Sequence, residues 1–130
     1  MATEASTSSG LSVETESMTA VHWFGVVLAL VTAAVHLVLG VRVPSGLGIS
    51  FLLAGLGFLG AIVLLLVGYR RRLLYLVGVP FTGAQLAIWY ALNVLPEGPL
   101  AVGAVGTFGA VDKIAQVLLI VVLIYLFRAE

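Results

Sequence analysis

The sequence predicts an all-α integral membrane bundle of four transmembrane helices, preceded by a disordered N-terminal tail. The 130 residues are 62% hydrophobic and only 9% charged, whereas a soluble domain carries about 45–50% apolar and about 25% charged residues. Four apolar stretches each approach the roughly 20 residues that cross about 30 Å of hydrocarbon. These stretches are continuous rather than alternating, which favours helices over a barrel as the spanning structure.

Residues 1–19 form the predicted tail. The segment is rich in Ser and Thr, and its charged side chains are Glu4, Glu14 and Glu16. Such a composition buries too little apolar surface to offset the entropy of ordering, so we expect disorder. The transmembrane domain is predicted over residues 20–130.

The four spans are predicted at about 21–40, 47–68, 73–94 and 106–127. Pro- and Gly-rich segments at 44–46 and 96–99 break the chain after the first and third spans. The start of the fourth span is less defined. Because glycines are closely spaced between Gly103 and Ala110, that segment suits a helix, a loop or a re-entrant turn.

Positively charged side chains predict the orientation in the membrane. Arg70, Arg71 and Arg72 fill the turn between the second and third spans, and Arg128 follows the fourth. In a four-span chain these two segments face the same side. The positive-inside rule therefore places them, and both termini, on the cytoplasmic side of a plasma membrane.

This orientation can be tested directly because the chain contains no cysteine. Ser45 lies in the turn predicted to face outward, so the Ser45→Cys variant is expected to react with a membrane-impermeant maleimide on intact cells. A variant that reacts only after lysis would reverse the predicted orientation.

Polar side chains inside the predicted spans are the candidate functional residues, because ionisable groups in a membrane are costly and rare. At about 1.5 Å per residue, His36, Gln85 and Asp112 each lie roughly 18–22 Å from the inner end of their spans. The candidate intramembrane polar cluster, in the outer half of the bilayer, consists of His36, Gln85, Asp112, Lys113 and Gln116.

Two interpretations of this cluster stay open. In the first, which we favour, Asp112 caps the start of the fourth helix. Lys113 then extends its ammonium group toward the headgroups, and the glutamines hydrogen-bond across helices. In the second, His36, Asp112 and Lys113 form a protonatable or ion-binding site that faces a water-filled crevice.

His22 and His36 raise one cofactor option. They lie 14 residues apart, hence about 21 Å along the helix axis and within roughly 40° of the same face. The spacing resembles the histidine pairs that ligate two haems in b-type membrane cytochromes. The later spans contain no histidine, so haem would require a homodimer. We otherwise expect no cofactor, no metal site and no catalytic group, because motifs for these are missing from the sequence.

Several segments together carry a family resemblance that extends over about residues 20–128. They are His22-Trp23, HLVLG at 36–40, GLGFLGAI at 55–62, GYRRRLLYLVGVPFTGAQ at 68–85, WYALN at 89–93 and VDKIAQ at 111–116. The pattern resembles small four-span membrane proteins of halophilic archaea that form a family of uncharacterised function. The resemblance implies the span count and a cell-membrane setting, and it implies no reaction or ligand.

The sequence favours a non-enzymatic membrane protein that acts as an accessory or interaction subunit. Its loops are small, and stripes of Gly and Ala at steps of four residues suit close helix packing, as at Gly83, Ala87 and Ala91. We expect the lipid bilayer and either another membrane protein or a second copy as partners. The formal net charge of zero argues against nucleic acid. The alternative is a small oligomeric transporter or channel that uses the polar cluster.

Overall fold

The computed structural model describes residues 13–43, 46–94 and 107–130, and within these ranges the chain is helical and has no strand. The long helices are α2 (Ala20–Arg42), α3 (Gly46–Leu66), α4 (Arg71–Trp89) and α5 (Thr107–Ala129). A 3-10 helix, η1 (Thr15–Ser17), precedes α2, and a π-helix, η2 (Tyr90–Val94), continues α4. Four helical segments are long and apolar enough to cross a membrane. The predicted four-span all-α fold is therefore confirmed.

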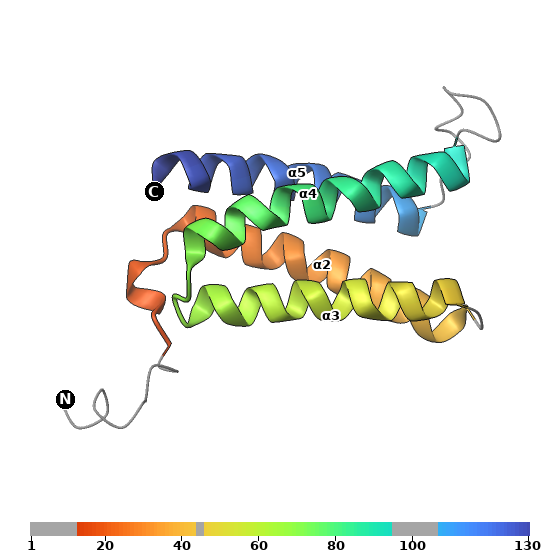
Figure 1. The fold of residues 1–130 in the computed structure, drawn as a ribbon, viewed down its shortest axis with the longest axis horizontal. Coiled ribbons are helices and arrows are strands. Elements are labelled where there is room, and N and C mark those ends of the chain that lie inside the picture. The colour runs from red at the N-terminus through yellow and green to blue at the C-terminus, as the bar shows by residue number, and fades with distance from the viewer. Residues whose placement is uncertain (1–12, 44–45, 95–106) are drawn as a thin grey trace.

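The helices form a bundle in which α2 and α5 make most of the long-range contacts. α2 packs against α3 and α5, and α5 packs against α4, whereas α3 and α4 share few contacts. Figure 1 shows α4 leaving α3 at the short turn that joins them and then running beside α5. Gly68 and Arg70 adopt left-handed backbone conformations in this turn, with φ of 71° and 45°, which lets the chain reverse within a few residues.

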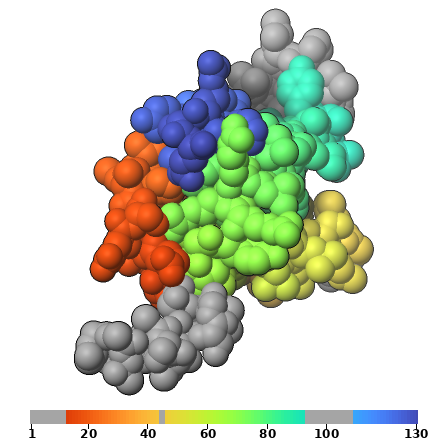
Figure 2. Space-filling model, turned by 60° about the vertical axis from the view of Figure 1, so that its left-hand side comes forward, coloured from red at the N-terminus to blue at the C-terminus, as the bar shows by residue number. Residues whose placement is uncertain are grey.

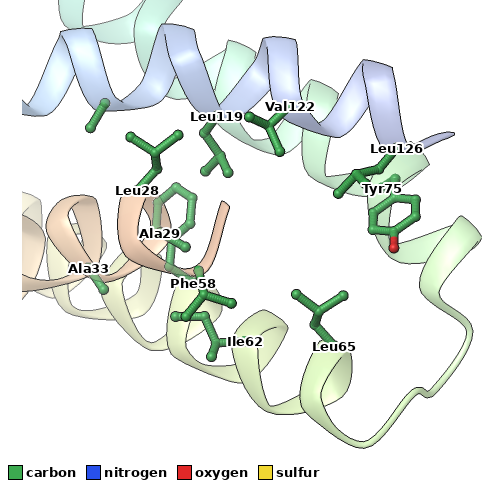
Figure 3. Packing of buried hydrophobic residues seen from close by; sticks show 12 residues of the cluster. Leu28, Ala29, Ala33, Phe58, Ile62, Leu65, Tyr75, Leu119, Val122 and Leu126 are labelled. Carbon is green, nitrogen blue, oxygen red and sulfur yellow. The ribbon is translucent and has the colours of Figure 1, made fainter. Parts of the chain in front are cut away.

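The core lies where α2, α3 and α5 face one another. Figure 3 shows Phe58, Ile62 and Leu65 of α3 opposite Leu119, Val122 and Leu126 of α5. On α2, small residues face these side chains. Ala29 and Ala33 are buried there, and a Cβ added to Gly25 would lie 3.2 Å from Val122 Cγ1. Small residues on α2 therefore allow both neighbouring helices to approach it closely.

Residues 13–19 depart from the predicted disorder of the tail. The Glu14 N–H donates to the Leu66 carbonyl at 2.6 Å. The Arg71 guanidinium donates to the Glu14 carbonyl at 2.8 Å, to Ser17 Oγ at 2.5 Å and to the Leu65 carbonyl at 3.0 Å. Figure 2 shows this segment against the end of the bundle. Composition accounts for apolar burial alone, and these charge-assisted hydrogen bonds hold the segment without it. Residues 1–12, the rest of the predicted tail, lie outside the described residues.

The observed helix ends refine the predicted spans. The third predicted span corresponds to α4 together with η2, and α5 begins at Thr107. Of the segment left open between Gly103 and Ala110, the part from Thr107 onward is helix, and residues 103–106 lie outside the described residues. Arg70, Arg71 and Arg72 stand at the start of α4, at the end of the bundle where the C-terminus also lies (Figure 1).

Candidate functional site

The five predicted polar residues meet in one hydrogen-bonded group, which we call the outer network after its predicted half of the bilayer. It draws on three helices and includes one residue that the sequence did not single out, Thr32. Its members are Thr32 and His36 of α2, Gln85 of α4, and Asp112, Lys113 and Gln116 of α5. Thr32 could have been suggested by its place four residues before His36, which puts both on one helix face.

Asp112 lies at the centre of the outer network. Its side chain is 3% exposed, and both carboxylate oxygens have partners. The Thr32 hydroxyl donates to Oδ1 at 2.5 Å, and Lys113 Nζ lies 2.8 Å from Oδ2. The two opposite charges are thus paired away from solvent, which is the arrangement that permits a charged side chain inside a membrane protein.

The position of Asp112 in α5 excludes the predicted helix cap. A capping residue precedes the first helical turn, but α5 begins at Thr107 and its first turn holds no acidic residue. Lys113 also differs from the prediction that it reaches the headgroups. Its Nζ turns toward Asp112 and donates to Gln116 Oε1 at 3.0 Å, and it lies 5.3 Å from the centre of the Trp89 ring. The nearby carboxylate provides a stronger local attraction than the distant headgroups.

The two glutamines hydrogen-bond across helices as predicted. Gln116 is fully buried, and its Nε2 donates to Gln85 Oε1 at 3.0 Å. Gln85 Nε2 donates in turn to the Phe81 carbonyl at 3.2 Å. The hydrogen bond between Gln116 and Gln85 therefore connects α5 to α4.

His36 lies near Asp112 without a hydrogen bond to its carboxylate. Its Nδ1 lies 2.8 Å from the Thr32 carbonyl and 3.8 Å from Asp112 Oδ1. Because a carbonyl oxygen only accepts, Nδ1 carries the proton in this contact. The ring is 5% exposed and lies near the rings of Phe51 and Phe58.

A second polar group, the inner cluster, joins His22, Tyr75 and Glu130 at the opposite end of α2. His22 Nε2 lies 2.8 Å from Glu130 Oε2 and 3.1 Å from the Tyr75 hydroxyl, which donates to the same carboxylate oxygen at 2.9 Å. The Thr19 N–H donates to His22 Nδ1 at 2.9 Å. His22 therefore carries its proton on Nε2, the reverse of His36.

The sequence linked neither Tyr75 nor Glu130 to His22, because the three come from distant parts of the chain. In the observed arrangement both ring nitrogens of His22 bond protein atoms, so haem ligation would require one of them to be released. Within the three described ranges, no group of three or more His, Asp or Glu side chains is placed to hold a metal ion.

Comparison with known proteins gives a family and no further relative. No curated protein and no solved structure matches the chain. A family described as one of unknown function matches residues 7–127, a range that includes the whole outer network as well as His22 and Tyr75. The chain therefore belongs to the Family of unknown function (DUF7475).

Proposed function

We propose that this protein is a non-enzymatic accessory or interaction subunit, and that α4 is the helix that packs against another membrane protein. One observation carries the proposal. The chain leaves a face of small residues on α4 uncovered, whereas it buries the comparable stripe of α2. We call the uncovered surface the small-residue face; it consists of Pro80, Gly83, Ala84, Ala87 and Ala91.

The small-residue face runs along one side of α4 and continues into η2, which contains Ala91. Pro80, Ala84, Ala87 and Ala91 are exposed, and their spacing of four, three and four residues keeps them on one stripe of a helix. A Cβ added to Gly83 would meet nothing within 4 Å. Small side chains let two helix backbones approach closely, which favours helix pairing in lipid.

The third span is also the least hydrophobic of the four. The most apolar 18 residues of Arg71–Leu92 have a mean hydropathy of 1.4, against 2.2 to 2.6 for those of the other three spans. Only 11% of these residues are buried within the chain, compared with 50% of the corresponding residues of Ala20–Arg42. A partner helix on the small-residue face would remove part of this less apolar span from the hydrocarbon.

The outer network suits a structural role beside this interface. Its charges are paired within the chain, and the Gln85–Gln116 hydrogen bond ties α4 to α5. The network therefore positions α4 for a partner.

We also propose that both termini face the cytoplasm, on the positive-inside rule, and that the plasma membrane of a halophilic archaeon is the setting, on the resemblance noted above.

Site-specific photo-crosslinking in native membranes tests the proposal. With a benzophenone amino acid at Ala84, we expect one discrete adduct with another membrane protein, identified by mass spectrometry. The same amino acid at Leu53, which is 65% exposed on α3, is the control and is expected to give lipid adducts. Adducts with a second copy alone, or no protein adduct from Ala84, would contradict the accessory role.

A further inference from the structure

A cavity of about 350 Å³ lies between α3, α4 and the other two helices. Its walls are nearly all apolar or glycine, from Phe58 and Ile62 of α3 to Leu119 and Val122 of α5. Figure 3 shows these four side chains facing one another across the bundle. Two members of the inner cluster, His22 and Tyr75, also line it, and so does Thr82. Ligand sites in proteins are typically apolar cavities of this size with a few polar groups.

Thr82 distinguishes this cavity from an ordinary packing defect. The residue is 1% exposed, and its Oγ1 is the one buried side-chain nitrogen or oxygen in the described part of the chain without a hydrogen-bond partner. An unsatisfied hydroxyl in a low-dielectric site is unfavourable, and most buried polar groups in proteins have a partner. Thr82 lines the cavity, so a ligand oxygen there would supply that partner once the side chain turns toward it.

The position of Thr82 limits the chemistry of the ligand. Thr82 lies eleven residues after Arg71, hence roughly 16 Å along the helix and near the middle of a bilayer core of about 30 Å. A charged headgroup is too costly to bring to that depth. The oxygen must therefore belong to a neutral, weakly polar group.

The apolar lining of the cavity favours a lipid-like molecule over water, because an apolar space lacks the polar partners that hold water molecules. We propose that the cavity binds a neutral lipid-like molecule, with its alkyl or isoprenoid body between α3 and α4 and one carbonyl or hydroxyl oxygen bonded to Thr82. This site is separate from the small-residue face.

Two variants test the site in the purified full-length protein, with a diazirine-bearing long-chain alcohol as the probe. Gly60 lines the cavity, and a Cβ added there meets nothing within 4 Å, so Gly60→Leu is expected to occupy the mouth of the cavity and to lower photolabelling at least tenfold. Gly46→Leu is the matched control, because a Cβ added to Gly46 also meets nothing within 4 Å and Gly46 does not line the cavity. Its labelling is expected to stay within twofold of the natural chain.

Thr82→Val tests the hydrogen bond, since valine keeps the shape and removes the hydroxyl. Labelling by the alcohol is expected to fall about threefold to tenfold, the effect of losing one neutral hydrogen bond, whereas labelling by the matching alkane probe is unchanged. Unaltered labelling of Gly60→Leu, or equal loss of both probes in Thr82→Val, would overturn the proposal. The crosslinking result at Ala84 bears only on the interaction function, so the two proposals can fail independently.

Discussion

Replacing Asp112 with leucine is expected to lower the free energy of unfolding by about 3–5 kcal/mol, the cost of leaving one partner of a buried ion pair unpaired. The substitution removes the countercharge of Lys113, whose side chain is only 15% exposed, and the acceptor of the Thr32 hydroxyl. Neither group has an alternative carboxylate nearby among the contacts of the outer network. Unfolding in mild detergent by titration with sodium dodecyl sulfate, followed by circular dichroism, measures the loss.

Two further variants show whether the ion pair causes this loss. Asp112→Leu combined with Lys113→Leu removes both charges, and most of the lost stability is expected to return because no buried charge remains unpaired. Arg128→Leu removes an exposed charge and is expected to change stability by less than about 0.5 kcal/mol. If Asp112→Leu cost no more than Arg128→Leu, the buried pairing of Asp112 with Lys113 would be wrong.

A different substitution of Asp112 distinguishes the proposed function from the alternative of a transporter or channel. The alternative is supported by the outer network, because its side chains come from three helices. Asp112→Asn keeps the volume of the side chain and an acceptor for Thr32 but removes the charge. A transporter that uses the network would lose its flux in proteoliposomes, whereas an interaction subunit would keep its crosslinked partner and lose only stability.

The sequence was sufficient to predict four apolar helices and the shared level of the polar residues along the bundle, because both depend on local properties. The length of an apolar run determines whether it crosses the membrane, and the rise per residue places a side chain along the helix. The structure accordingly brings Gln85 and Gln116 within hydrogen-bond distance. Which helix faces meet depends on packing, so the contact of Thr32 with Asp112, 80 residues apart, could not be predicted.

Errors in the predicted site arose where a helix boundary or a distant contact decided the role of a residue. The sequence favours Asp112 as a cap because the glycines before it obscure the start of α5, which lies at Thr107. The inner cluster was missed because Tyr75 and Glu130 gave no local signal of their proximity to His22. Thr82 was missed for the same reason, since only packing reveals that its hydroxyl has no partner.

Gly48→Ala is expected to lower the free energy of unfolding by about 3 kcal/mol, at the upper end of the usual cost of overpacking. A Cβ at Gly48 would clash with the carbonyl oxygen of Val43 and lie 2.9 Å from that of Gly40. Both atoms belong to the backbone at the end of α2, so no side-chain rotation relieves the clash. The first turn of α3 would have to move away from α2, with loss of contacts along the most closely packed helix pair.

Gly46→Ala is the matched control for this clash, since Gly46 lies in the same turn of α3 and a Cβ there meets nothing within 4 Å. Its stability is expected to match or slightly exceed that of the natural chain, because alanine reduces the entropy of the unfolded state. The difference between the two variants then isolates the close approach of α3 to α2. Both variants are compared in the same dodecyl sulfate titration, and equal unfolding would show that the close approach of α3 to α2 at Gly48 is wrong.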